Sequence, residues 1–391
     1  MQALALTKAA LCTPFHLHEE ATVLIDQGKI IAAGPSAAIA IPAGYREVPL
    51  EGLVLAPGLI DQHLHGGGGA AVMDGEPDAL IEIAKYHATH GVTSFLATTT
   101  SGSRDQLVKV AKAYARLGEL QYKGAQCLGV HLEGPYLAPG RAGVHRQDTL
   151  RAPSLEEIAT LHQLSGNGIR MVTMAPELPG AVETAVAIQT KGIIAAIGHS
   201  EADYATTKAA IERGFGCVAH CCNQLGLLHH REPGVLGAVL ADPDLPVEII
   251  VDGQHLHPAM VQILWKLKGA ERLILISDAM PPAGLPDGSY QLPEGAVRLH
   301  QSRLENAAGQ LAGSVISLDT AVRNTFEILQ CELTEALRMA TYNPARLLGL
   351  NKTKGSIYPG KDADLIALTP DLDVVMTMVK GEVISGLISL G

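Results

Sequence analysis

Eight short apolar runs recur along the middle of the chain, and stretches with helical periodicity separate many of them. The runs lie at residues 59–65, 92–100, 127–134, 169–177, 193–200, 217–223, 246–253 and 273–279. Residues 77–91 and 154–168 are two of the helical stretches, and the second opens with the capping-box pattern Ser154-x-x-Glu157. Continuous apolar strands that alternate with helices are typical of buried parallel sheets, so the pattern predicts an α/β fold, a closed (β/α)8 TIM-like barrel.

The two ends of the chain share a different pattern, made of short strands and turns. The segment ATVLIDQGKIIAAGP, for example, holds an apolar run, a polar turn and a second apolar run. A chain of 391 residues is long enough for a large barrel with a smaller appendage. We therefore predict one small β-sandwich domain from residues 1–55 and 351–391, beside a barrel of residues 56–350.

Composition limits the partners that this chain can bind. The net charge of −11 argues against nucleic acid and anionic membranes, although a single arginine can still bind a small anion. The N-terminus lacks the pattern of a signal peptide, and the sequence holds no apolar stretch long enough to span a bilayer. The six cysteines have no C-x-x-C spacing and read as reduced, buried thiols, so a cytoplasmic location is expected.

Ionisable side chains stand at the ends of five of the predicted strands: His63, His65, Glu133, His199, His220 and Asp278. Barrels of this kind build their sites at the carboxyl ends of the strands. Imidazole and carboxylate groups that converge there can bind a divalent metal, which lowers the pKa of water and creates a nucleophile. A carboxylate at Asp278 can then accept the proton of that water. This constellation predicts a metal-dependent hydrolase.

Other interpretations of single residues stay open. The H-x-H pair can be two unrelated polar residues, and His199 and His220 can be neutral core histidines. His131 reads as a packed core histidine that faces away from Glu133. Asp61 and Asp252 are competing carboxylates, and Asp252 is favoured as a turn residue. Cys221 and Cys222 are possible soft metal ligands, although packing is favoured. The run Gly66–Gly69 is either a flexible turn or a place where the backbone approaches a ligand closely.

The order of these motifs resembles the amidohydrolase superfamily and, within it, the N-acetylglucosamine-6-phosphate deacetylases. The resemblance rests on H-x-H, HLEGPYL, GHS, AHCCN and ISDAMPPAG, together with HREPG, DGQH and LAGS, and covers almost the whole chain. It implies an amidohydrolase-type barrel. Some barrels of this architecture carry a carboxylated lysine after the fourth strand, but VTMAPELPG contains no lysine, so Glu133 is the only nearby candidate to bridge two metals.

The resemblance also implies roles for individual residues. Glu133, His199 and His220 match metal ligands, Asp278 matches the general acid/base, and His145 matches a histidine that orients the acetamide carbonyl. The remaining matches to the substrate site are Val144, Asn223, Gln224, Arg231, His255, Leu311, Ala312 and Gly313. The alternative for His255 is a purely structural role. The alternatives for Arg231 are an ion pair with Glu232 or a place at the start of a helix.

The implied reaction is removal of the N-acetyl group from N-acetylglucosamine 6-phosphate, with one or two divalent ions per subunit (Zn, Fe, Mn or Co). Some family members replace the H-x-H histidines and use one metal, so the presence of His63 and His65 here implies two, bridged by Glu133. Arg231 matches an arginine that reaches the phosphate from the neighbouring subunit, which implies a homodimer. Gln224 stands where a small residue is expected and His229-His230 precede the arginine, so the sugar preference between the glucosamine and galactosamine epimers stays open. An amidohydrolase that acts on a different amide is a further alternative. A non-catalytic scaffold would need vacant ligand positions, and none is vacant.

Overall fold

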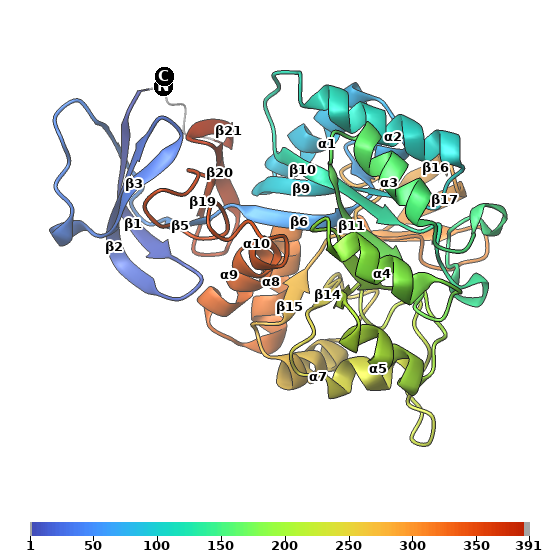
Figure 1. The fold of residues 1–391 in the computed structure, drawn as a ribbon. Helices are drawn as coiled ribbons and strands as arrows, with labels where there is room; N and C mark the ends of the chain where they lie inside the picture. Colours follow the sequence, from blue (N-terminus) through green and yellow to red (C-terminus); the bar gives the residue numbers. More distant parts are fainter. Residues whose placement is uncertain (1, 387–391) are drawn as a thin grey trace.

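The structure is a computed structural model and describes residues 2–386. All eight predicted middle strands are present and form one parallel sheet in sequence order (Figure 1). These strands are β6 (Leu59–Leu64), β9 (Val92–Thr99), β10 (Gln126–Glu133), β11 (Ile169–Met174), β12 (Ile194–Ile197), β13 (Phe215–Val218), β14 (Val247–Ile249) and β15 (Leu273–Leu275). The backbone N–H of Asp278 donates to the carbonyl of His63 at 2.9 Å, which joins the segment after β15 to β6. The predicted barrel is confirmed.

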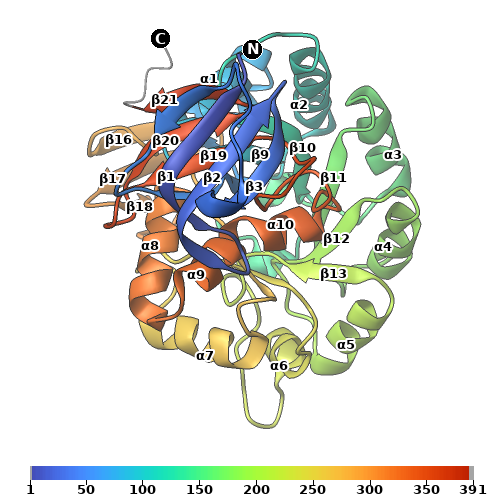
Figure 2. The ribbon, with the colours of Figure 1, turned by 90° about the vertical axis from the view of Figure 1, so that its left-hand side faces the viewer.

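Helices cover the outside of this sheet (Figure 2). They are α1 (Pro77–Ala88), α2 (Arg104–Leu117), α3 (Leu155–Leu164), α4 (Ala181–Gln189), α5 (Tyr204–Glu212), α6 (Gly234–Ala241), α7 (Pro258–Lys268), α8 (Leu318–Leu329), α9 (Leu333–Ala340) and α10 (Tyr342–Leu347). Short 3-10 turns occupy Ser36–Ala38, Val72–Asp74, Pro139–Arg141 and Gln147–Thr149. None of the helices in the described part of the chain is long and apolar enough to cross a membrane.

The predicted capping box at the start of α3 is only half formed. Ser154 Oγ accepts a hydrogen bond from the backbone N–H of Glu157 at 3.2 Å, as the pattern predicts. The Glu157 carboxylate, however, accepts from Arg151 and from the hydroxyl of Tyr136 rather than from the Ser154 backbone. Because a buried carboxylate gains more from a guanidinium than from a helix-end amide, the ion pair takes precedence.

The strands from both chain ends form a second, mixed sheet, as predicted. It consists of β1 (Leu4–Cys12), β2 (Leu17–Asp26), β3 (Lys29–Pro35), β4 (Arg46–Pro49), β5 (Val54–Pro57), β19 (Leu365–Leu368), β20 (Val374–Val379) and β21 (Glu382–Gly386). Gln27 and Gly28 make the β2–β3 turn with φ of 47° and 77°, which is typical of a tight hairpin. The strands share one apolar core that includes Leu6, Val23 and Met376. The exact boundaries of the two domains stay a prediction.

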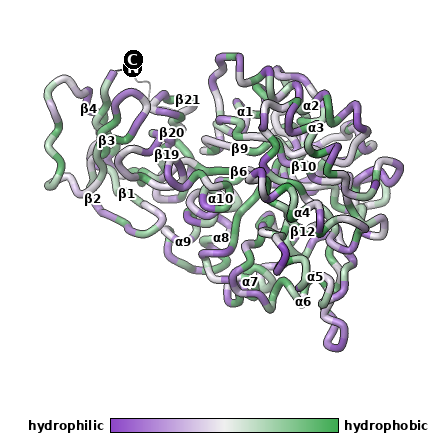
Figure 3. Tube along the Cα trace, viewed as in Figure 1, coloured by the Kyte–Doolittle hydropathy of each residue, from purple (hydrophilic) through white to green (hydrophobic). Residues whose placement is uncertain are grey.

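The sheet from the chain ends positions the site by fixing the direction of β6. This strand follows β5 of the small sheet after one residue, Gly58, and runs into the barrel, so the carboxyl ends of the barrel strands face away from that sheet (Figure 1). Hydrophobic residues recur along the barrel strands, and hydrophilic residues are frequent in the loops (Figure 3). A layer that includes Ile60, Leu96 and Met171 fills the lower barrel and packs against Leu347 and Leu348. The carboxyl ends of the strands beyond that layer are left for the polar side chains of the site.

An insertion after β15 was not predicted from the sequence. It forms a three-stranded antiparallel sheet of β16 (Gly288–Leu292), β17 (Gly295–His300) and β18 (Arg303–Asn306). Its buried residues pack against Met280, Ala312 and Val144. The insertion therefore supports the loops that surround the mouth of the barrel.

The glycine run after His65 packs tightly within the protein. Gly66 and Gly67 form β7 and pair with β8 (Ala70–Ala71). A Cβ atom on Gly67 would lie 2.5 Å from the Tyr86 ring, and one on Gly66 would lie 2.4 Å from the Ala70 carbonyl. These glycines are therefore required by close packing rather than by an approach to a ligand.

Candidate active site

Glu133, the last residue of β10, lies at the centre of the site and is 2% exposed. Imidazole Nε2 atoms from five histidines surround its carboxylate. The distances to the nearer carboxylate oxygen are 2.7 Å from His220, 3.2 Å from His145, 3.3 Å from His63 and from His65, and 3.4 Å from His199. The strand-end residues that the sequence analysis singled out thus converge on one point.

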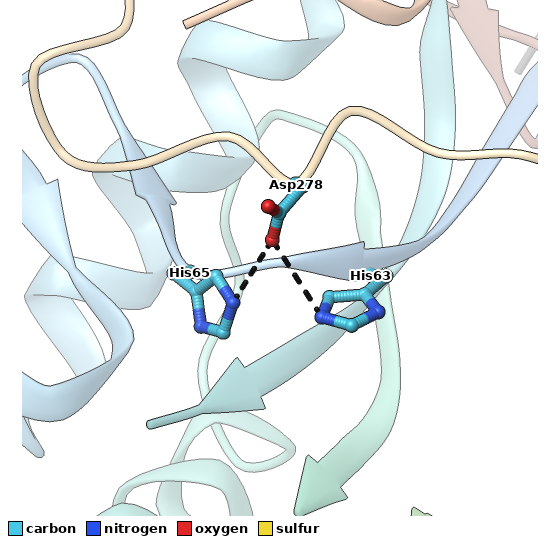
Figure 4. A group of neighbouring side chains, drawn as sticks. All are labelled: His63, His65 and Asp278. Carbon is cyan, nitrogen blue, oxygen red and sulfur yellow. Dashed lines mark ion pairs between the residues drawn. The ribbon is translucent and has the colours of Figure 1, made fainter. Parts of the chain in front are cut away.

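Asp278 completes this cluster from the segment after β15. Its carboxylate projects between the two histidines of the H-x-H pair (Figure 4). Oδ1 lies 3.1 Å from His65 Nε2 and 3.7 Å from His63 Nε2. The carboxylate is 7% exposed, so it reaches both the histidines and the open mouth of the barrel.

Three of these side chains are held by an unusual backbone conformation. His199, His220 and Asp278 follow β12, β13 and β15, and have φ values of 48°, 28° and 51°. Residues other than glycine avoid this left-handed region because the Cβ atom is crowded there. Such strain is stored at functional sites, where the surrounding structure holds it in place. Here it coincides with the chain leaving the strand at the mouth of the barrel.

The partners of Nδ1 determine which way each imidazole presents its Nε2 atom. His65 Nδ1 lies 3.2 Å from the Thr98 carbonyl and His199 Nδ1 lies 2.7 Å from the Arg141 carbonyl, so both Nδ1 atoms donate. Their Nε2 lone pairs then face the carboxylate oxygens, an arrangement that requires a cation or a proton between them. His145 is the reverse case, because its Nδ1 accepts from the Ser101 backbone N–H at 3.0 Å. Its Nε2 therefore carries a proton and donates.

The electrostatics of the cluster agree with this arrangement. Burial would raise the pKa of Asp278, but the hydrogen bond and charge of His65 and the charge of His63 outweigh it and lower the pKa to about 2. Burial would lower the pKa of His65, but Asp278 and Glu133 raise it to about 9. Burial dominates at His199 and lowers its pKa to about 4. The buried carboxylates are thus ionised at neutral pH and need positive charge beside them.

The donor set fits a divalent metal. Three groups of side chains each bring their ligand atoms within 4.8 Å of one another: His63–His65–Asp278, His63–Glu133–His220 and Glu133–His145–His199. His63 Nε2 is buried and has no hydrogen-bond partner in the structure. Imidazole nitrogens and carboxylate oxygens suit Zn, Fe, Mn and Co. Cys221 belongs to none of these groups, and all six cysteines are free thiols.

A cavity of about 270 Å³ opens beside the cluster. Seven of the predicted substrate-site residues line it, namely Val144, His145, Asn223, Gln224, His255, Leu311 and Gly313. Ala312 is buried behind them and lines a smaller neighbouring cavity of about 110 Å³. Thr100 and Gln310 also line the main cavity, and the sequence analysis missed them because isolated polar residues carry no motif. Met280 lines it as well and lies inside the ISDAMPPAG motif, but no role was predicted for it.

Arg231 does not reach this cavity within its own chain. It lies exposed in the loop between β13 and α6, which projects from the barrel below α6 (Figure 2). Its side chain makes no ion pair with any of residues 2–386, so the alternative of pairing with Glu232 is not observed. Helix α6 begins only at Gly234, so Arg231 does not start a helix either. The described residues that line the cavity include no lysine or arginine.

The two competing carboxylates hold neighbouring parts of the site. Asp61 Oδ1 accepts from the backbone N–H of His63 at 3.2 Å, and burial raises the pKa of Asp61 to about 7. Asp252 accepts from the backbone N–H groups of Gln254 and His255, as expected of a turn residue. In addition, Asp252 Oδ2 lies 2.7 Å from His255 Nδ1, so it also orients the His255 ring.

One interpretation of a histidine was wrong in its direction. His131 is buried, as predicted, and its Nε2 lies 2.8 Å from Thr173 Oγ1. However, it does not face away from the site, because its ring centroid lies 4.6 Å from that of His63. Residues two apart in a strand share a face, so His131 and Glu133 both point into the barrel, with His131 one layer deeper.

The carboxylate of Glu248 also went unnoticed in the sequence. It lies in β14, within the apolar run PVEIIVDG, and is fully buried beside His63. A charged residue inside an apolar strand is itself a signal, because burial is costly unless a partner compensates the charge.

Comparison with known proteins agrees with the fold and the site. Residues 54–384 match the amidohydrolase family, and the chain belongs to this family of hydrolases. The chain is 39% identical over 363 residues to an N-acetylgalactosamine-6-phosphate deacetylase of Escherichia coli O157:H7, covering 93% of this chain and 96% of that protein. It is 38% identical over 374 residues to an N-acetylglucosamine-6-phosphate deacetylase of Vibrio furnissii, covering 94% and 91%.

Solved structures of the same kind superpose closely. An alanine mutant of N-acetyl-D-glucosamine-6-phosphate deacetylase from Mycobacterium smegmatis, in complex with N-acetyl-D-glucosamine-6-phosphate, is 32% identical with a TM-score of 0.92. That match covers 98% of this chain and 100% of the other. The N-acetylglucosamine-6-phosphate deacetylase from Thermotoga maritima is also 32% identical, with a TM-score of 0.87 and the same coverage. The predicted amidohydrolase barrel is thus confirmed.

Proposed function

We propose that this protein hydrolyses the acetamide bond of N-acetylglucosamine 6-phosphate and releases glucosamine 6-phosphate and acetate. The observation that carries the proposal is the Glu133 carboxylate, ringed by imidazoles and joined by Asp278, at the wall of a cavity of about 270 Å³. Relatives that match nearly the full chain are deacetylases of N-acetylated amino-sugar 6-phosphates. All predicted metal-binding positions carry ligand side chains, which disfavours a non-catalytic scaffold.

In this proposal Glu133, His199 and His220 hold one divalent ion, and His63, His65 and Asp278 can hold a second. Such an ion supplies Lewis acidity, which polarises a carbonyl group and lowers the pKa of water. Availability in the cell selects among Zn, Fe, Mn and Co, since this donor set accepts each of them. Free cysteines fit the reducing cytoplasm, which we include in the proposal.

The chain's own residues handle the protons and the developing charge. Asp278 accepts a proton from the attacking water as the new carbon–oxygen bond forms. His145 Nε2–H, fixed as a donor by the Ser101 backbone, stabilises the oxygen that gains negative charge. Asp278 then delivers its proton to the nitrogen as the carbon–nitrogen bond breaks, so the products are acetate and a free amine.

The galactosamine epimer is the second candidate substrate, because the Escherichia coli relative is an N-acetylgalactosamine-6-phosphate deacetylase. The two sugars differ at one hydroxyl group. Acetate release should be measured from both 6-phosphates and from unphosphorylated N-acetylglucosamine. We expect the highest kcat/KM with N-acetylglucosamine 6-phosphate and at least a tenfold lower value without the phosphate. A preference for the unphosphorylated sugar would contradict the proposal.

We further propose that the protein is a homodimer in which Arg231 of one subunit binds the substrate phosphate in the other. The cavity residues described above include no lysine or arginine, and a guanidinium suits a phosphate dianion. Leu227 and Leu228 in the same loop are 81% and 56% exposed, which fits a surface that a second subunit covers.

Arg231→Ala should therefore weaken the use of the 6-phosphate substrate by roughly 2–5 kcal/mol, the usual cost of removing one partner of a buried charge pair. The slow reaction on the unphosphorylated sugar should change far less. Arg213→Ala, which removes an exposed arginine at the end of α5, is the control. Mixing Arg231→Ala with Asp278→Asn subunits should restore part of the activity, because a mixed dimer contains one intact site. No recovery after verified subunit exchange would refute the shared site.

A further inference from the structure

Glu248 is a buried carboxylate that the proposed reaction does not use. It lies in β14, inside the barrel, and is 0% exposed. Oε2 lies 2.8 Å from His63 Nδ1, and Oε1 accepts a hydrogen bond from Gln62 Nε2 at 2.7 Å. Within residues 2–386 no lysine or arginine pairs with it. A charge buried at this depth is stable only with a compensating partner, and here that partner is His63.

The contact distinguishes His63 from the other imidazoles around Glu133. The Nδ1 atoms of His65 and His199 lie against the backbone carbonyls of Thr98 and Arg141, which carry no formal charge. Among the five histidines that surround Glu133, only His63 has its Nδ1 atom beside a carboxylate of the described residues. A carboxylate behind a metal-binding histidine fixes its tautomer and orientation and makes the opposite nitrogen more basic.

His63 takes part in only some of the possible metal groups. It groups with His65 and Asp278, and it also lies within reach of Glu133 and His220. It is not one of the three residues assigned above to the first ion, which are Glu133, His199 and His220. A change at His63 should therefore affect one metal position more than the other.

We propose that Glu248, held by Gln62, is a positioning residue that enables His63, with His65 and Asp278, to bind a second divalent cation. The inference deepens the proposed function and rests on it only for the role of that cation in deacetylation. With Glu248 in place, His63 keeps its proton on Nδ1 and presents the Nε2 lone pair to the cation. The carboxylate also adds one negative charge close to the site, which offsets the repulsion between two neighbouring cations.

Two substitutions separate the charge from the hydrogen bond. Glu248→Gln keeps the volume and one carbonyl oxygen that can accept from His63, but removes the charge. Glu248→Leu removes both acceptors and leaves His63 Nδ1–H and Gln62 Nε2 buried without partners. The affinity for the second cation should thus fall from wild type to Glu248→Gln and further to Glu248→Leu.

The test is titration of chelator-treated, full-length protein with Zn²⁺, followed by equilibrium dialysis and metal analysis. We expect two Zn²⁺ ions per wild-type chain. In Glu248→Gln the first ion should bind as in wild type, and the dissociation constant of the second should rise about 10- to 100-fold, as is usual when an outer-shell partner is lost. Activity at low free Zn²⁺ should fall and should return when excess Zn²⁺ is added, which a structurally damaged enzyme would not show.

Glu157→Gln is the matched control, since Glu157 is a buried carboxylate that pairs with Arg151 and belongs to none of the metal groups found among the described residues. It should bind both ions as wild type does. An unchanged second-ion affinity in both Glu248 variants, an equal loss of both ions, or a single ion in the wild type would each overturn the inference. Zn²⁺ binding needs no substrate, so failure of deacetylation with intact two-ion binding would reject the proposed function and leave this inference standing.

Discussion

Replacing Asp278 by asparagine should lower kcat by on the order of 10²-fold or more, the usual scale for a lost general acid/base. Asparagine keeps the size of the side chain but cannot accept the proton of the attacking water. The pKa of Asp278 is lowered to about 2, so the wild-type group is a carboxylate over the whole neutral range. KM should change little, because the proton transfer belongs to the transition state. Steady-state kinetics on N-acetylglucosamine 6-phosphate measure both quantities.

The matched control is Asp287→Asn, which removes an exposed carboxylate on the insertion side of the same loop. It should retain wild-type kinetics. Metal content must be measured in parallel, because Asp278 is also within reach of the His63–His65 group. Near-normal turnover by Asp278→Asn with its metal content intact would exclude Asp278 as the proton carrier.

Glu133→Gln and His199→Ala should each remove most of the bound metal and lower activity by about 10²-fold or more. Loss of an outer-shell partner alone costs 10- to 100-fold in metal affinity or activity, and these two residues stand in the metal cluster itself. Glutamine keeps the volume of the Glu133 side chain but removes the negative charge that the five imidazoles surround. Elemental analysis and circular dichroism together should show less metal in a folded protein.

His162→Ala is the control for this pair, since His162 lies on α3 and takes part in no metal group among the described residues. It should bind metal as wild type does. Wild-type metal content in both Glu133→Gln and His199→Ala would show that these side chains are not ligands, whatever their effect on turnover.

The sequence predicted the barrel well because each strand is a continuous apolar run, and the chain order of the strands dictates their pairing. It also predicted which residues converge, since carboxyl ends of parallel strands meet on one face. The ends of the later strands were predicted less well. The run 273–279 was expected to be strand throughout, whereas β15 ends at Leu275 and Asp278 lies in the left-handed region beyond it.

Other parts of the site depend on tertiary contacts that no local pattern encodes. The insertion at Gly288–Asn306 consists of short strands in which buried and exposed positions alternate, a weak signal beside the long apolar runs. The hydrogen bond between the side chains of Glu248 and His63 joins residues that are 185 positions apart in the sequence. The tautomer of His145 depends on the backbone N–H of Ser101, which has the same chemistry in every sequence.

The central claim is tested most directly by following the products of wild-type enzyme with N-acetylglucosamine 6-phosphate by proton NMR. Acetate and glucosamine 6-phosphate should appear in equal amounts. The reaction should stop when a chelator removes the metal and should resume when a divalent ion is restored. Absence of acetate from metal-loaded protein, or acetate release at an unchanged rate after verified metal removal, would contradict the account.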